Sequence, residues 1–263
     1  MWNFTAWRQR RVLNKYPISV ETWEQALSHL PLLHGFTAAE LTRLKELAVL
    51  FLHKKVIETA GDLELNESMK LIIALQACLP ILYLGLDWYE GWVSIIVYPA
   101  GFMVQRDQID TAGIVHPRQQ ALSGESWLRG PVIISWSDAA YSGYIDGHNL
   151  LIHEFAHKLD MQNGSANGMP PLHKNMDRKT WTEVFSHAYA ELQHMILSGH
   201  PTPIDPYGVE SPAEFFAVLS EVFFETPNVI QHYYPAVYPQ LRAFYRQDPA
   251  SRLGLTKPVE PLT

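Results

Sequence analysis

Two histidines and a glutamate lie in a mostly apolar helical segment, Leu150 to Asp160, which reads LLIHEFAHKLD. Because residues four apart lie on one helical face, His153 and His157 can direct both imidazoles at one cation. The apolar neighbours predict that this helix is buried, where an imidazole without a partner is costly. The alternative is a pair of core histidines satisfied by hydrogen bonds, for which a mostly apolar helix offers few partners. The chain must therefore fold so that other segments bring polar groups to this face.

The residues of this helix favour a catalytic zinc ion. Zinc accepts neutral imidazole nitrogens, and a catalytic zinc site has three protein ligands and an open water position. Glu154, which follows His153, is placed to act as general base on that water. Asp160, three residues after His157, has the spacing of a carboxylate that orients a ligand imidazole. We therefore predict one Zn²⁺ per chain, with His153 and His157 as ligands and Glu154 as a catalytic residue.

The third zinc ligand must come from another segment, and the expected helix over residues 179–197 offers one set of candidates. His187, Glu191 and His194 share a face of this helix by their spacing. A solvated or ordinarily packed face is the simpler interpretation of this set.

The expected helix over residues 212–225 offers a second set of candidates. Glu214 and Glu221 lie two turns apart among apolar residues, where a glutamate must be paired, capped or bound to a metal. Ser211 and Glu214 also have the spacing of a capping box, so the local pattern leaves Glu214 equally a cap or a ligand.

Composition limits the other functions open to the chain. Its 263 residues are 47% hydrophobic, enough for a sizeable core, and its net charge of −7 argues against direct binding of nucleic acid. The single Cys78 excludes an intramolecular disulfide and a cysteine-based metal site. The most apolar run, Leu71 to Leu84, is shorter than the roughly 20 residues that span a bilayer, and the N-terminus lacks the pattern of a signal peptide. We expect a cytoplasmic protein without a membrane segment.

The order of sequence patterns predicts an α+β fold, mostly helical with a small mixed sheet. The first 85 residues are expected to be helical, with helix starts at Ser19, Thr37 and Asn66. Strands are expected over residues 92–98 and 132–136, followed by further helices. We predict a helical portion, residues 1–85, packed on a catalytic portion, residues 86–263, in one continuous domain.

The motif His153 to Asp160, preceded by Asp146 to Asn149, resembles the Mlc titration factor A family of small bacterial zinc metallopeptidases. The similarity extends over most of the chain, including Gly130 to Trp136 and Tyr207 to Phe216. That family in turn resembles the catalytic domain of anthrax lethal factor, which implies a zincin-like fold of the gluzincin type. The resemblance implies that Glu214 is the third zinc ligand. It also implies that Tyr207, seven residues earlier, donates a hydrogen bond to the reacting oxyanion.

The resemblance also implies an activity and partners. It suggests an aminopeptidase acting on short peptides that also binds the glucose-responsive transcriptional repressor Mlc and relieves repression of sugar-uptake genes. The alternative is a non-catalytic protein that titrates the repressor and carries a structural or vestigial zinc site. Glu154 favours the enzyme, because a structural site needs no general base. In such peptidases an edge strand pairs with the substrate backbone, and Val132 to Ser135 is the candidate strand; the alternative is that it is a plain core strand.

Overall fold

The computed structural model describes residues 4–100, 102–109, 115–122, 124–126 and 130–254. The first part of the chain forms α1 (Phe4–Lys15), α2 (Val20–Ser28), η1 (Pro31–Leu33), α3 (Ala38–Lys54), β1 (Val56–Thr59), α4 (Glu67–Cys78) and η2 (Leu86–Tyr89). The strands β2 (Ser94–Tyr98), β3 (Phe102–Ile109), β4 (Val115–Leu122), β5 (Gly124–Ser126) and β6 (Val132–Ser135) follow. The remainder forms α5 (Trp136–Ala139), α6 (Leu150–Asp160), η3 (Met161–Asn163), α7 (Arg178–Leu197), η4 (Pro206–Val209), α8 (Pro212–Glu225), α9 (Pro227–Tyr233), α10 (Val237–Tyr245) and α11 (Pro249–Arg252).

The three helix starts expected near the N-terminus are confirmed by their caps. The Ser19 side chain accepts a hydrogen bond from the Thr22 backbone N–H, and α2 begins at Val20. Thr37 forms a complete capping box with Glu40 at the start of α3. The Asn66 side chain caps α4 in the same way as Ser19 caps α2. These side chains satisfy backbone N–H groups that a helix end would otherwise leave unpaired.

The main sheet is mixed and has the strand order β1-β2-β6-β5. The strands β1, β2 and β6 run parallel, whereas β5 runs antiparallel to β6. Because β6 has a hydrogen-bonded neighbour on each side, the interpretation of Val132 to Ser135 as a substrate-pairing edge strand was wrong. At that end of the sheet the edge strand is β5.

The strand β1 is a feature that the helical interpretation of the first 85 residues did not include. It spans only Val56–Thr59 and pairs with β2 from Val56↔Ser94 to Thr59↔Val97. Four residues are too few for a two-residue period to stand out from the helices on either side. Because α3 ends at Lys54, the residues that follow it lie next to β2, on the side away from β6, and pair there as a strand.

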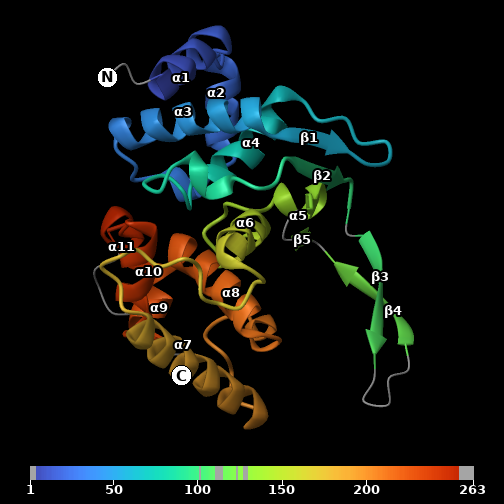
Figure 1. Cartoon of the computed structure of the whole chain (residues 1–263), viewed down its shortest axis with the longest axis vertical. Coiled ribbons are helices and arrows are strands. Elements are labelled where there is room, and N and C mark those ends of the chain that lie inside the picture. Colours follow the sequence, from blue (N-terminus) through green and yellow to red (C-terminus); the bar gives the residue numbers. More distant parts are fainter. Residues whose placement is uncertain (1–3, 101, 110–114, 123, 127–129, 255–263) are drawn as a thin grey trace.

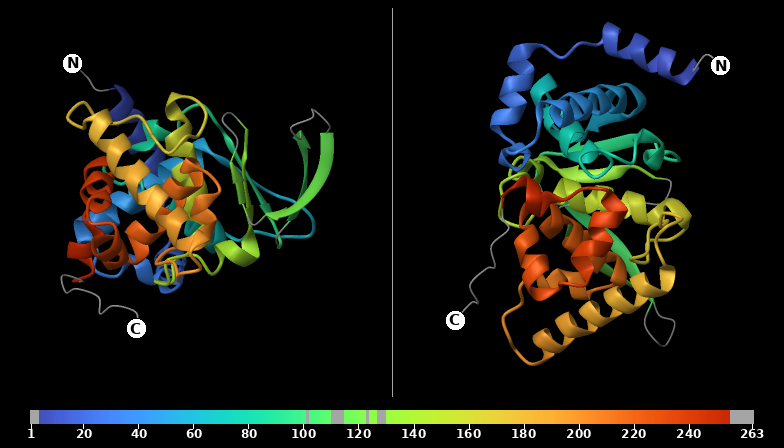
Figure 2. Two further views of the ribbon diagram at one scale, coloured as in Figure 1. Left: turned by 90° about the horizontal axis from the view of Figure 1, so that it is seen from below. Right: turned by 90° about the vertical axis from the view of Figure 1, so that its left-hand side faces the viewer.

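The helices that pack beside the main sheet contact one another directly: α4 packs against both α3 and α6, and α8 packs against α6. In Figures 1 and 2, α3 lies toward the N-terminal end of the molecule with β1, and α6 and α8 lie further from that end. A separate antiparallel hairpin, β3 with β4, projects from the body of the molecule. A single buried cluster includes Phe51 and Leu75 from the first 85 residues as well as Phe155 and Phe216 from the rest. The chain is thus an α+β protein, while the division at residue 85 and the one-domain organisation stay predictions. Across the described residues, no helix combines the length and the apolar character needed to cross a membrane.

Candidate metal centre

The helix α6 holds both histidines in a fixed orientation. The Asn149 side chain accepts a hydrogen bond of 2.9 Å from the Ile152 backbone N–H and caps the helix start. On α6, Phe155 packs against the rings of Phe51, Tyr89 and Trp92, with centroid separations of 5.8, 5.4 and 5.9 Å. These aromatic residues come from α3, η2 and the segment before β2. The N-terminal helices therefore fix α6, and the two histidines project from a rigid element.

The helix α8 supplies the third side chain. The Ser211 hydroxyl accepts a hydrogen bond of 3.2 Å from the Glu214 backbone N–H, which is half of the expected capping box. The Glu214 carboxylate is directed at the histidines of α6, and Oε2 lies 2.9 Å from His153 Nε2 and 3.1 Å from His157 Nε2. The sequence left open whether Glu214 caps α8 or binds a metal. In the structure its carboxylate lies at the two histidines.

The three ligand atoms have the spacing that a small cation requires. His153 Nε2 and His157 Nε2 are 3.2 Å apart, so all three separations lie between 2.9 and 3.2 Å. A triangle of this size has a circumradius of about 1.8 Å, slightly less than the ~2.0–2.1 Å of a zinc–nitrogen bond. A zinc ion held by these three ligands would leave its fourth position for water. In the part of the chain that the structure describes, no other three His, Cys, Asp or Glu side chains bring their ligand atoms this close together.

The electrostatics of the cluster favour a bound cation. Burial disfavours the charged form of His153, but hydrogen bonds to Glu214 and Glu221 outweigh it and raise the pKa of this imidazole well above 6.5. Burial also opposes ionisation of Glu214, yet the hydrogen bonds from His153 and His157 hold the pKa of its carboxyl well below its usual range. The carboxylate charge thus persists at neutral pH and attracts either protons or a metal ion to the two imidazoles.

Glu154 and Tyr207, the two residues expected to take part in catalysis, lie at this cluster. Glu154 is buried on α6 directly after the ligand His153, and its charge raises the pKa of that imidazole. Tyr207 lies in η4, where Asp205 Oδ1 accepts its backbone N–H at 2.8 Å. The Tyr207 ring is 40% exposed, and its centroid lies 6.0 Å from that of His153. The structure therefore places a phenol on the solvent-facing side of the cluster.

Comparison with known proteins gives the family of the chain. The profile of the family described as glucose-regulated metallo-peptidase M90 matches residues 4–246. The chain belongs to this metallopeptidase family. It is 42% identical over 236 residues to the Mlc titration factor A of Salmonella arizonae, a match that covers 88% of this chain and 92% of the relative. The Mlc titration factors A of Salmonella typhi and Salmonella typhimurium are also 42% identical, each over 239 residues and 89% of both chains. The family resemblance is thus confirmed.

The role expected for Asp160 in this M90 family member is not the one that the structure shows. Asp160 Oδ2 accepts hydrogen bonds of 2.7 Å from the backbone N–H groups of Asn167 and Gly168. No hydrogen bond joins Asp160 to His157. Asp160 Oδ1 and His157 Nδ1 are both buried without a hydrogen-bond partner among the described residues. Asp160 therefore anchors the loop after α6 and does not hold the ligand imidazole.

Glu221 contacts a ligand imidazole, although it was considered only as a rival ligand. Its Oε1 lies 2.7 Å from His153 Nδ1, the ring nitrogen that faces away from Glu214. A carboxylate can only accept, so Nδ1 carries the proton and Nε2 is the nitrogen left for a metal. Glu221 is therefore outside the triangle of ligand atoms.

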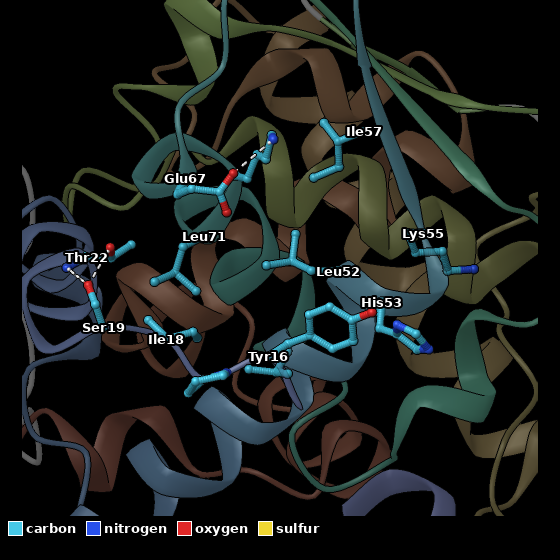
Figure 3. A pocket seen from close by; sticks show the side chains of 13 residues that line it. Tyr16, Ile18, Ser19, Thr22, Leu52, His53, Lys55, Ile57, Glu67 and Leu71 are labelled. Atoms are coloured by element: carbon cyan, nitrogen blue, oxygen red, sulfur yellow. Dashed lines mark hydrogen bonds and ion pairs between the residues drawn. The ribbon is translucent and has the colours of Figure 1, made fainter. Parts of the chain in front are cut away.

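The other candidate ligands lie elsewhere. His187, Glu191 and His194 are exposed on α7 and do not join the cluster. A pocket of about 580 Å³ lies in the N-terminal portion, and Figure 3 shows side chains that line it, among them Leu52 and Leu71. None of the residues that line it belongs to the metal cluster.

Sequence reasoning missed a buried polar network behind the cluster. The Asn149 side-chain amide donates hydrogen bonds of 2.8 Å to both Gln76 Oε1 and Glu225 Oε1. Gln76 and Glu225 are polar residues with apolar neighbours in α4 and α8, which was the available signal because such residues need partners when buried. Which partner each one finds depends on how α4, α6 and α8 pack.

Proposed function

We propose that this M90 family member is a zinc-dependent peptidase with a zincin-like fold of the gluzincin type. The observation that carries the proposal is the convergence of His153 Nε2, His157 Nε2 and Glu214 Oε2 within 3.2 Å of one another, beside Glu154. Two imidazoles and one carboxylate with an open side are the donor set of a catalytic zinc site. In this proposal, His153, His157 and Glu214 hold the ion.

The residues around the ion have separate roles in peptide hydrolysis. A zinc ion bound by these residues would polarise the scissile carbonyl and make the water more acidic. Glu154 accepts a proton from the attacking water on its carboxylate and later passes it to the leaving amine. The Tyr207 hydroxyl donates a hydrogen bond to the oxygen on which negative charge develops, and its exposed ring next to His153 is consistent with this role.

The substrate backbone can pair with the edge of the sheet. The strand β5 is at the edge next to α6, which makes it the natural partner for an extended peptide in place of β6. The aminopeptidase type of cleavage rests on the family resemblance, and a cytoplasmic location stays a prediction from the sequence patterns.

Metal removal tests the enzyme proposal. Chelation should abolish hydrolysis of short peptides with free N-termini, and a stoichiometric amount of Zn²⁺ should restore it. Glu154→Gln keeps the size of the side chain but loses the base, so it should retain zinc while hydrolysis falls by roughly 10²- to 10⁴-fold. Full turnover in zinc-depleted protein would exclude the zinc mechanism, and near-normal turnover of Glu154→Gln would exclude Glu154 as the base.

The names of the relatives support a second function, the binding of a repressor related to Mlc. We propose that the chain binds such a repressor through a protein surface and does not contact DNA. Repressor affinity measured on Glu154→Gln separates the two functions. Lost hydrolysis with unchanged binding is expected if binding does not depend on catalysis. A non-catalytic titrating protein with a structural zinc site would instead show binding and no hydrolysis in the wild type.

A further inference from the structure

One imidazole of the metal cluster is held between two carboxylates from the same helix. Glu214 Oε2 lies 2.9 Å from His153 Nε2, and Glu221 Oε1 lies 2.7 Å from Nδ1 of the same ring. The two glutamates are seven residues apart, about two turns of α8. Both ring nitrogens therefore find their partner on one rigid element.

We propose that Glu221 is a positioning residue for the metal site, which fixes His153 in the tautomer and orientation that leave Nε2 available to the ion. This inference rests on the metal site of the proposed function. An imidazole has one proton to share between two nitrogens when it is neutral. A carboxylate at Nδ1 retains that proton there and increases the basicity of Nε2.

The contacts of Glu221 explain why it can hold the ring so firmly. Its second oxygen, Oε2, accepts the backbone N–H of Asn149 at 2.5 Å. Asn149 is the N-cap of α6, the helix that carries His153. Glu221 is only 7% exposed, so water does not compete for these hydrogen bonds. One side chain of α8 thus binds α6 at its first turn and at its first metal ligand.

An amide cannot replace this carboxylate. Both partners of Glu221, the Asn149 backbone N–H and the His153 Nδ1–H, are donors. A glutamine has one acceptor oxygen, so Glu221→Gln must give up one of the two hydrogen bonds. If the amide N–H₂ faces the ring, the neutral imidazole keeps its proton on Nε2, where the proton competes with the metal.

The same helix offers a matched control in Glu225, one turn beyond Glu221. Glu225 is fully buried and accepts hydrogen bonds from the Gly143 and Gly147 backbone N–H groups and from the Asn149 side chain. Like Glu221, it accepts hydrogen bonds from backbone and side-chain N–H groups. It does not touch a ligand imidazole, so Glu225→Gln should disturb folding without acting on the metal.

The test measures metal affinity and fold separately. Zinc affinity is determined by competition with a chelator at one pH for wild type, Glu221→Gln and Glu225→Gln. The thermal unfolding of each metal-free protein gives the effect on the fold. We expect Glu221→Gln to weaken zinc binding by about 10- to 100-fold, the usual effect of removing the partner of a ligand histidine. The zinc affinity of Glu225→Gln should stay within about 3-fold of wild type, even if its unfolding temperature falls as far as that of Glu221→Gln.

Cobalt(II) gives an independent reading of ligand geometry, because its visible absorption depends on coordination. The Co²⁺ spectrum should change in Glu221→Gln and match wild type in Glu225→Gln. If the amide variant of Glu221 does not fold, Glu221→Asp and Glu225→Asp allow the same comparison, because each retains the charge but withdraws the carboxylate by one methylene.

Two results would overturn the inference: zinc affinity of the Glu221 variant within about 3-fold of wild type, or an equal loss in the Glu225 variant. The failure of the proposed function is a different result. Wild-type protein that binds zinc but cleaves no peptide would refute the peptidase and leave the positioning role of Glu221 intact.

Discussion

The buried carboxyl of Glu225 should make stability depend on pH in a direction that is opposite to the usual one for acidic residues. Burial raises its pKa from 4.5 to about 8, and the charges of Asp146 and Glu221 act in the same direction. Hydrogen bonds from the Asn149 side chain and the Gly147 backbone N–H lower the pKa and only partly compensate. At neutral pH the folded state therefore holds a proton that the unfolded state has released.

The sign and size of the effect follow from proton linkage. Below pH 4.5 both states are protonated, and the contribution of Glu225 to stability is fully present. Between pH 4.5 and about 8 the folded state binds more protons, so the free energy of unfolding decreases as pH rises, by up to about 1.4 kcal/mol per pH unit. Above about pH 8 both states are ionised and the loss is complete. Over this interval the loss amounts to about 3–5 kcal/mol.

Glu225→Gln isolates this contribution, because glutamine does not titrate. Urea unfolding of wild type and variant, both in chelator, should be measured from pH 5 to 9. Other titrating groups cancel in the difference between the two free energies, which should decrease steadily to about pH 8 and then level off. Glu46→Gln, at an exposed position of α3, is the control for the substitution itself. A difference that is flat or increases with pH would show that Glu225 is ionised in the fold at pH 5.

Two further predictions concern a ligand and a glycine. Glu214→Ala should remove most of the zinc affinity, whereas His187→Ala and His194→Ala should retain one zinc per chain by metal analysis; tight zinc binding in Glu214→Ala would reduce Glu214 to a capping residue. Gly143→Ala should lower the free energy of unfolding by about 2–4 kcal/mol in urea, because φ is +95° and a Cβ would lie 2.7 Å from Leu30 Cδ2. Gly199→Ala should cost only about 1–2 kcal/mol, because φ is +68° but a Cβ there would meet nothing within 4 Å. Equal losses of unfolding free energy in the two variants would rule out crowding at Gly143.

The features that local rules control could be predicted from the sequence. Helix starts at Ser19, Thr37 and Asn66 depend on a side chain and an N–H three residues away. The shared face of His153 and His157 depends only on the helical period. Helix α8 begins at Pro212 and ends at Glu225, as its pattern predicted. Each of these features is complete within one segment of the chain.

The features that depend on packing between segments could not be predicted in the same way. Spacing alone could not decide between Glu214 and Glu221, because both lie in α8 and both reach His153. The structure separates them by ring nitrogen, since Glu214 lies at Nε2 and Glu221 at Nδ1. The edge or interior position of β6 likewise depends on where β5 pairs, which no pattern within Val132 to Ser135 records.

Asp160, the carboxylate that helical spacing placed at the ligand His157, instead contacts the loop after α6. Asp160 holds the backbone of Asn167 and Gly168, and a Cβ at Gly168, where φ is +78°, would collide with the Pro212 carbonyl. Pro212 is the first residue of α8 and lies two residues before Glu214. The loop after α6 is thereby pressed against the start of the helix that carries the third ligand. Asp160 therefore holds a loop that contacts the start of the helix carrying Glu214, the residue that lies 2.9 and 3.1 Å from the two histidines.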